Sequence, residues 1–195
     1  MKHASDAILS TVLLALSSPI LLLCALAIKI DSPGPAIYWQ FRCGRNGKPF
    51  RMFKLRTMVS DADWRRALLE KRKDVQGPVF KLFHDPRITR VGRLLRKTSL
   101  DELPQLYNVL KGEMSLVGPR PLAADEMRCC PSWRDHRLSV KPGITGLWQI
   151  NGRSRAHFHD WIRHDVDYAK NVSLWLDAKI RFRTLTAVIR GSGAY

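Results

Sequence analysis

The most informative stretch for both fold and chemistry is Thr98–Pro121, TSLDELPQLYNVLKGEMSLVGPRP. It places two adjacent carboxylates, Asp101 and Glu102, ahead of a Gly-Pro-Arg-Pro loop. Neighbouring acids of this kind suit metal-assisted phosphoryl chemistry. The same letters also match a capping box, with Ser99 as the N-cap and Glu102 at the third helical position. Both interpretations stay open from these residues alone.

Positive charge flanks the acidic pair on both sides in the sequence, from Arg93, Arg96, Lys97 and Arg120. A carboxylate among guanidinium groups stays ionised and available as a ligand or a nucleophile. The N–H groups of a helix N-terminus attract phosphate, and the planar fork of an arginine held between prolines suits the same group. Pro104 also deprives the second turn of a backbone donor, which weakens the purely structural interpretation.

The whole chain is strongly basic. It has 195 residues and a formal net charge of +16, from 33 Lys+Arg against 17 Asp+Glu. The length fits one domain of ordinary size. The charge favours nucleic acid, anionic lipid headgroups or phosphorylated small molecules, without choosing among them. The four cysteines show neither zinc-ligand spacing nor a disulfide framework, which predicts reduced thiols facing the cytosol.

An uncharged apolar segment occupies residues 7–28. Its 22 residues reach roughly 33 Å as a helix, enough to cross a bilayer. Pro19 lies almost midway, however, and a proline removes a backbone hydrogen bond and kinks a helix. A re-entrant hairpin broken at Ser18-Pro19 is therefore the alternative to a plain crossing. The hydroxyls of Ser17 and Ser18 could bond to the carbonyls that Pro19 frees.

The rest of the chain alternates strand and helix signals. Residues 36–41 and 49–58 flank an Asn-Gly pair, a strong β-hairpin signal. Alternation in the second run predicts an apolar face and a basic face that carries Lys54 and Arg56. Helices are expected at about 61–73 (capped by Ser60), 122–130, 156–170 and 174–190. The last of these suits either the lipid interface or a protein core.

Four segments resemble the bacterial sugar transferases, the monotopic polyprenyl-phosphate hexose-1-phosphate transferases that initiate surface polysaccharide assembly. They are KLRTM, DPRITRVGRLLRKTSLDELPQLYNVLKGEMSLVGPRPL, KPGITGLWQINGR and DYAKNVSLWLDAKI. The resemblance covers essentially the whole chain. It implies a helix-rich α+β fold, with a re-entrant membrane helix over 1–30, a cytosolic catalytic domain with a β-hairpin over 31–195, and interfacial amphipathic C-terminal helices. It also implies a location on the cytoplasmic face of the bacterial inner membrane.

The resemblance also implies roles for individual residues. Asp101 matches the family's nucleophile, which would attack a UDP-sugar, release UMP and pass the phosphosugar to undecaprenyl phosphate. Glu102 would serve as a metal-site group or as a base, and Asp101 and Glu102 together would hold Mg²⁺. The implied phosphate or substrate contacts are Arg96, Arg120, Lys54, Arg56 and Asp165, and the implied membrane break is Ser18 with Pro19.

Several alternatives remain. The charge also suits a membrane-tethered nucleic-acid-binding module, although no nucleic-acid motif is present, and we expect membrane lipids rather than nucleic acid as partners. A bitopic protein with the same chemistry is a third possibility, and a homo-oligomer is possible. His157, His159 and His164 are interpreted as solvated or interfacial rather than metal ligands. Cys43 replaces an expected aliphatic residue, with an effect on packing only. The chain is either a small family form or part of a larger relative, and the sugar is not readable.

Overall fold

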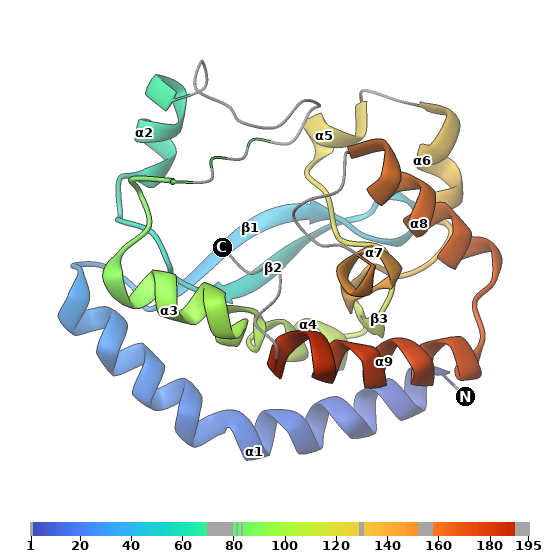
Figure 1. Cartoon of the computed structure of the whole chain (residues 1–195), viewed down its shortest axis with the longest axis horizontal. Helices are drawn as coiled ribbons and strands as arrows, with labels where there is room; N and C mark the ends of the chain where they lie inside the picture. The colour runs from blue at the N-terminus through green and yellow to red at the C-terminus, as the bar shows by residue number, and fades with distance from the viewer. Residues whose placement is uncertain are drawn as a thin grey trace.

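The computed structural model describes residues 2–69, 80, 82, 84–128, 131–151 and 158–189, and shows a helix-rich α+β fold (Figure 1). The predicted fold class is confirmed at this level. Its helices are α1 (Lys2–Asp31), α2 (Ala62–Leu69), α3 (Arg90–Thr98), α4 (Gln105–Leu110), α5 (Ala124–Arg128), α6 (Pro131–Leu138), α7 (Leu147–Ile150), α8 (Phe158–Lys170) and α9 (Leu174–Ile189). The strands are β1 (Ile37–Cys43), β2 (Pro49–Leu55), β3 (Ser115–Val117) and β4 (Gly143–Thr145).

The Asn-Gly pair forms the predicted β-hairpin. β1 pairs antiparallel with β2, from Ile37 opposite Leu55 to Cys43 opposite Pro49. The turn contains a short 3-10 segment, Arg45–Gly47, in which Asn46 and Gly47 take φ values of 56° and 74°. Asn and Gly tolerate this left-handed conformation better than other residues, so the turn chemistry fixes where the strands reverse.

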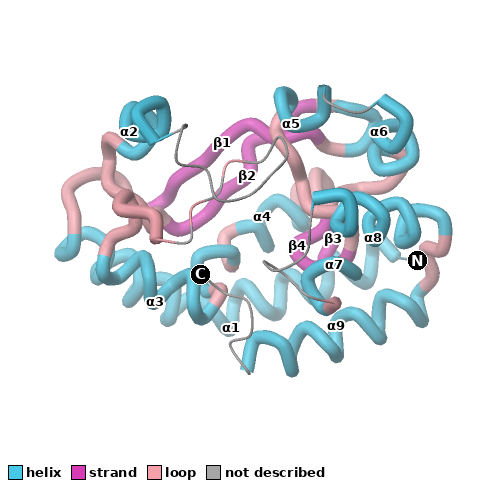
Figure 2. The backbone as a smooth tube through the Cα atoms, turned by 45° about the horizontal axis from the view of Figure 1, so that its top comes forward, coloured by secondary structure: helices cyan, strands magenta, loops and turns pink. Residues whose placement is uncertain are grey.

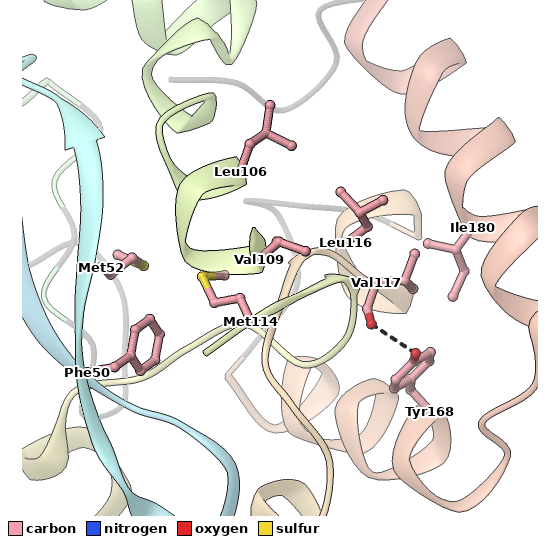
Figure 3. Packing of buried hydrophobic residues seen from close by; sticks show 9 residues of the cluster. All are labelled: Phe50, Met52, Leu106, Val109, Met114, Leu116, Val117, Tyr168 and Ile180. Carbon is pink, nitrogen blue, oxygen red and sulfur yellow. Dashed lines mark hydrogen bonds between the residues drawn. The ribbon is translucent and has the colours of Figure 1, made fainter. Parts of the chain in front are cut away.

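A second, parallel pair of strands holds the middle of the molecule. Ser115 of β3 lies opposite Gly143 of β4, and Val117 lies opposite Thr145. The main core packs β2 and α4 against β3, α8 and α9 (Figure 3). Its buried members are Phe50, Met52, Leu106, Val109, Met114, Leu116, Val117, Tyr168 and Ile180. This core joins the hairpin to the segments on both sides of the acidic pair.

Helix α1 is a single bent helix. It runs without interruption from Lys2 to Asp31 with Pro19 inside it, and changes direction near its middle (Figure 1). The expected break at Ser18-Pro19 is therefore a kink inside one continuous helix, and the expected hydroxyl contact is confirmed for Ser18. Ser18 Oγ donates to the carbonyl of Ala15 at 2.8 Å, the group that Pro19 cannot bond. This side-chain hydrogen bond replaces the missing backbone bond, so the helix can bend and still continue.

The apolar surface of α1 is largely uncovered. It is the one helix in the described ranges that is long and apolar enough to cross a bilayer, and only 6% of its most apolar window is buried. Its large exposed residues include Leu16, Leu23 and Ile30. The concave side packs on α3 and α4, where Ile28 is buried beside Leu55 and Leu95.

The remaining predicted helices are confirmed within the described residues. α2 ends its described part at Leu69, and residues 70–73 lie outside it. α5 accounts for the helix near 122–130, and α8 and α9 for the last two. α9 has one face in the protein core, and its placement at a lipid interface stays a prediction. Ile180 is fully buried in the core, whereas Trp175 and Phe182 are 81% and 70% exposed on the other side. Figure 2 shows α9 on the same side of the molecule as α1.

Candidate active site

The acidic pair lies in a tight 3-10 turn, Leu100–Glu102, between α3 and α4. Helix α3 ends at Thr98, and Ser99 takes the left-handed conformation, with φ 59°. Its N–H closes α3 by donating to the carbonyl of Arg96 at 3.1 Å. The predicted capping box is therefore wrong, because an N-cap residue needs an extended backbone and the Ser99 side chain makes no capping bond.

Close backbone packing positions α3. Thr89 Oγ1 accepts from the N–H of Gly92 at 3.0 Å and caps the helix. A Cβ on Gly92 would lie 2.0 Å from the carbonyl oxygen of Thr57, so only glycine allows this approach. Arg96, one turn later, donates from Nε to Thr57 Oγ1 at 3.0 Å. The side chain of Arg96 is thus fixed beside the acidic turn.

Two cations hold Glu102. Lys54 Nζ, near the end of β2, lies 2.9 Å from Glu102 Oε1. Arg120 Nη1, from the Gly-Pro-Arg-Pro loop, lies 3.4 Å from the same oxygen and stacks 5.6 Å from the Trp148 ring. Burial alone would raise the pKa of Glu102, but the charges and hydrogen bonds of Lys54 and Arg120 lower it to about 2. Glu102 is therefore a permanently ionised carboxylate.

Asp101 meets different surroundings. It is only 8% exposed, and its carboxylate accepts no hydrogen bond from any residue within the described part of the chain. Burial is the main cause that raises its pKa; the Glu102 charge adds to this, while Lys54, Arg96 and Arg120 oppose it. Asp101 is thus an unengaged carboxylate within a ring of cations, and such a group is available for bonding to a substrate.

The Gly-Pro-Arg-Pro loop is fixed from behind. A Cβ on Gly118 would lie 2.5 Å from the carbonyl oxygen of Lys141, so the loop packs directly on the segment before β4. The guanidinium of Arg137 donates to the carbonyl of Arg120 and, at 2.8 Å, to Asp165 Oδ2. Both partners of this ion pair are buried. The pair places the backbone that carries Arg120.

The predicted phosphate contacts therefore divide into two groups. Lys54, Arg96 and Arg120 surround Asp101 and Glu102, whereas Arg56 and Asp165 do not. Arg56 follows β2 and is buried, with Nη1 and Nη2 donating to the carbonyls of Pro33 and Ser32. Its expected place on an exposed basic strand face is wrong, because the strand has already ended at Leu55. Lys54 shares a face with buried Phe50 and Met52 and reaches Glu102 beyond them.

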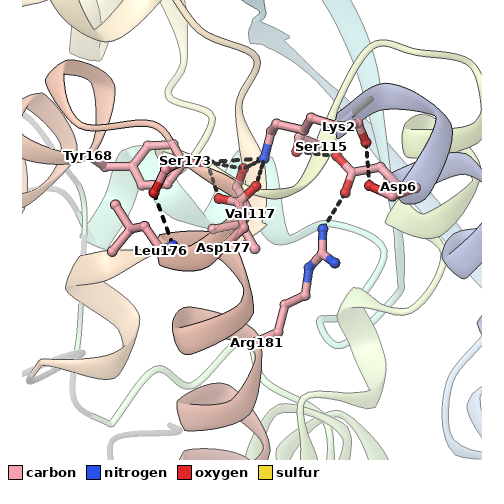
Figure 4. Close-up of polar contacts among 10 residues, drawn as sticks. Lys2, Asp6, Ser115, Val117, Tyr168, Ser173, Leu176, Asp177 and Arg181 are labelled. Atoms are coloured by element: carbon pink, nitrogen blue, oxygen red, sulfur yellow. Dashed lines mark hydrogen bonds and ion pairs between the residues drawn. The ribbon is translucent and has the colours of Figure 1, made fainter.

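Sequence analysis missed the network at the N-terminal end of α1 (Figure 4). Lys2 Nζ donates to buried Asp177, to the carbonyl of Val117 at 3.2 Å and to the hydroxyl of Tyr168 at 3.1 Å. Asp6 accepts from Ser115 Oγ at 2.5 Å and from Arg181 at 2.6 Å. Val117 directly precedes Gly118, so this network reaches the base of the Arg120 loop. The available signal was a lone acid at the start of an apolar helix.

The residues present are compatible with a divalent cation. Mg²⁺ is usually bound through one or two carboxylates together with waters and substrate phosphates. Asp101 supplies a free carboxylate, and Glu102 uses only Oε1 for its two cation contacts. Within the described ranges no cluster of three or more acidic, His or Cys residues could hold a metal by itself. The pair therefore suits a cation that arrives with a phosphorylated substrate.

The chain belongs to the bacterial sugar transferase family, whose sequence model matches residues 1–191. It is 45% identical over 204 residues to the undecaprenyl-phosphate galactose phosphotransferase of Salmonella typhimurium, covering 100% of this chain and 42% of that protein. It is 40% identical over 201 residues to the exopolysaccharide production protein ExoY of Rhizobium meliloti, covering 100% and 88%. The UDP-glucose:undecaprenyl-phosphate glucose-1-phosphate transferase of Escherichia coli is 41% identical over 203 residues, with 100% and 41% covered.

The chain spans less than half the length of several curated relatives that it matches, including those of Salmonella typhimurium and Escherichia coli. The family resemblance predicted from the motifs is confirmed. Membership favours a transferase over the nucleic-acid-binding alternative, since the match includes the acidic turn and the Gly-Pro-Arg-Pro loop.

Proposed function

We propose that this chain transfers a hexose-1-phosphate from a UDP-sugar to undecaprenyl phosphate, giving undecaprenyl-diphospho-sugar and UMP in a surface polysaccharide pathway. The observation that carries the proposal is the unengaged, buried carboxylate of Asp101 beside Lys54, Arg96 and Arg120. The names of the relatives supply the two substrate classes. Cations around one free carboxylate suit a diphosphate substrate, whose negative charge they would balance.

In the proposed first step, an Asp101 oxygen attacks the sugar-proximal phosphorus. The bond from that phosphorus to the bridging oxygen breaks, UMP leaves, and a phosphosugar-aspartyl intermediate remains. In the second step, a phosphate oxygen of undecaprenyl phosphate attacks the same phosphorus and displaces the carboxylate. A covalent intermediate of this kind splits one transfer into two steps. It also allows a soluble and a lipid substrate to use one site in turn.

The other residues of the site have positioning and electrostatic roles in this proposal. Arg96 and Arg120 clamp phosphate oxygens, since a guanidinium fork matches their geometry. Lys54 fixes Glu102 and adds positive charge. A carboxylate with a pKa of about 2 is a weak base, so Glu102 fits the metal-site role better than the base role. Mg²⁺, held by Asp101 and Glu102 with the diphosphate, would neutralise negative charge on the transferring group.

The test of the nucleophile is UMP release from UDP-glucose, UDP-galactose and N-acetylated UDP-sugars, with undecaprenyl phosphate and the full chain in lipid particles. Asp101→Asn removes the nucleophile in a nearly isosteric way, so we expect UMP release to fall by at least about a thousandfold. Glu113→Gln is the matched control. It makes the same kind of change at a carboxylate in the turn after α4, where Glu113 bonds Lys111 and Asn108 rather than the acidic pair. Near wild-type release by Asp101→Asn would refute the assignment.

We further propose that α1 enters and leaves the cytoplasmic face of the inner membrane without crossing it. Lys2 and Asp6 tie one end of α1 to α9 and β3, and Asp31 Oδ2 accepts from the N–H of Val91 at the other end. Both ends therefore bind one domain, and the bent helix between them lies along the outside of the molecule (Figure 1), with most of its apolar side chains uncovered. A crossing helix would separate its N-terminal end from Asp177 and Arg181.

Cysteine labelling tests this topology. His3→Cys lies at an exposed position next to Lys2, and the native cysteines are replaced in the background. A membrane-impermeant maleimide should label this position only after the cytoplasmic face is opened. Labelling from the periplasmic side in intact cells would support the bitopic alternative instead.

A further inference from the structure

A shallow basic pocket lies away from the acidic pair, between the hairpin turn, the end of α4 and the segment before β4. Its volume is about 380 Å³, and its charged lining consists of Arg45, Lys48, Lys111, Lys141 and Glu113. Four cations from three separate segments thus line a pocket that holds one carboxylate. The chemistry proposed above for the acidic turn uses none of them.

The single carboxylate of this pocket is already engaged. Glu113 Oε1 lies 2.7 Å from Lys111 Nζ, and Glu113 Oε2 accepts from Asn108 Nδ2 at 2.7 Å. Within the ranges that the structure describes, Arg45, Lys48 and Lys141 form no ion pair. Three cations therefore line the pocket without a carboxylate partner.

These cations also repel one another. Burial is the main cause that lowers the pKa of Lys141, and the Arg45 charge lowers it further. Lys141 is in turn the main cause that lowers the pKa of His3, at the start of α1. Asp6 opposes both effects, but its oxygens already bind Ser115 and Arg181. Crowded positive charge of this kind is relieved when an anion binds.

The backbone holds the cations in place. The N–H of Gly44 donates to the carbonyl of Lys48 at 2.8 Å and closes the hairpin turn. Lys141 Nζ lies beside Gly112, whose φ of 75° favours glycine in this turn. Turn and loop therefore fix the backbone from which the three cationic side chains extend, which limits the entropy lost on binding to the ordering of those side chains.

The pocket is separate from the proposed active site. Lys48 directly precedes β2, and Lys54 is close to its end. Six residues at ~3.3 Å each place these two lysines roughly 20 Å apart along the strand. His3 connects the pocket to the N-terminal end of α1, whose apolar surface is exposed a turn later at Ile8.

We propose that Arg45, Lys48 and Lys141 form a second anion site that binds a phosphate group. The chemistry fits both a phospholipid headgroup at the membrane surface and a free phosphate. Arg45 supplies a planar fork for two phosphate oxygens, and the two ammonium groups supply point charges. The site does not depend on the proposed transfer reaction.

The test follows individual lysines by NMR, using the full chain in zwitterionic micelles at constant ionic strength. Reductive ¹³C-dimethylation keeps the lysine charge, and single Lys→Arg variants assign the signals of Lys48, Lys54 and Lys141. The probes are dihexanoyl phosphatidylglycerol and, separately, inorganic phosphate. We expect saturable shifts of Lys48 and Lys141. A response to both probes identifies recognition of the phosphate group itself, and a response to the lipid alone identifies a headgroup site.

The double variant Arg45→Gln/Lys48→Gln should weaken binding at least about tenfold, because two charge-assisted contacts are lost. Its affinity is read from the shift of the Lys141 signal. Lys141→Gln, followed through Lys48, gives an independent measure if the double variant folds poorly. The matched control, Arg163→Gln/Lys170→Gln, removes two exposed charges from α8 and should leave the affinity unchanged. The proposal fails if neither probe shifts Lys48 or Lys141 saturably, or if the control weakens binding as much as the pocket variants do.

Discussion

Asp101 and Glu102 are neighbours in the chain, yet the pKa values of their carboxylates shift in opposite directions. Lys54 and Arg120 contact Glu102 directly, so their charges outweigh the effect of burial and lower its pKa. Asp101 receives the same charges from farther away and without hydrogen bonds, so burial prevails and its pKa rises. Two adjacent acids with opposite shifts are typical of sites in which each has its own role. Here the free carboxylate suits the nucleophile and the bound one suits the metal site.

At this scale we predict that Lys54→Met moves the acidic limb of kcat/KM to higher pH. The nucleophile must be ionised, so activity falls as pH drops through the pKa of Asp101, which is already raised. Lys54 is the largest of the charges that oppose this rise, and its removal raises the pKa further. Lys54→Arg retains the charge and should leave the limb close to wild type. An unchanged limb in Lys54→Met, measured by UMP release across pH, would contradict the assignment.

At the level of elements, the buried pair of Arg137 in α6 and Asp165 in α8 supports the loop of Arg120. Burial raises the pKa of Asp165 to about 6, although Arg137 opposes the rise. The sequence alone suggested a site residue at Asp165. The structure gives it an indirect contact with the site, through the backbone of Arg120.

We predict that Arg137→Gln lowers the free energy of unfolding by about 3 kcal/mol at neutral pH, since it leaves a buried charge unpaired. Without Arg137 the folded-state pKa of Asp165 rises further. A raised folded-state pKa means that stability is gained as pH falls through it. The variant therefore gains stability at a higher pH than the wild type, and the deficit should shrink as pH falls from alkaline values toward about 6 and stay constant below that. Arg134→Gln, on the same helix and paired only with exposed Asp135, is the control. Thermal unfolding in detergent at several pH values measures both variants.

The contact of α3 with the loop after β2 depends on one glycine. We predict that Gly92→Ala destabilises the chain by about 3 kcal/mol, because the new Cβ would overlap the carbonyl of Thr57. The displacement would also carry Arg96 away from Thr57. Leu94→Ala, on an exposed position of the same helix, should cost less than about 0.5 kcal/mol. Equal melting temperatures for the two variants would show that the packing is not tight.

For the whole molecule, the important arrangement is that α1 is bound to the domain at both ends. The N-terminal network also contains the hydroxyl of Tyr168, 2.9 Å from the carbonyl of Val117 and 2.7 Å from Asp177 Oδ1. Burial, assisted by Asp177, raises the pKa of Tyr168, so this hydroxyl stays protonated and able to donate. The apolar helix α1 and the loop of Arg120 therefore share one buried polar cluster.

We predict that Lys2→Met destabilises the folded chain by roughly 3 kcal/mol, because Asp177 remains as a buried charge without its cation. The double variant Lys2→Met/Asp177→Asn should lose less than the sum of the two single variants, since the unpaired charge is then gone. The melting temperatures of the wild type, the two single variants and the double variant, all measured in the same detergent, complete the double-mutant cycle. Strict additivity would mean that the pair does not couple α1 to the domain.

Local pattern was sufficient for the features that depend on neighbouring residues. The Asn-Gly turn, the apolar helix and the positions of most helices follow from backbone preference and periodicity, and these need no tertiary information. The long motif around Asp101 and Glu102 was sufficient for the family, which the match over residues 1–191 confirms. The expected homo-oligomer stays a prediction, and the sequence contains no motif that selects one sugar.

Tertiary structure decided which polar groups meet. Lys54 and Arg56 look equivalent in the sequence, but one reaches Glu102 and the other binds the loop after α1. Ser99 matched an N-cap, yet it ends α3 with a left-handed backbone. Lys2 and Asp177 are 175 positions apart. Such pairings depend on where distant segments pack, because a side chain's partner and pKa are set by its neighbours in space.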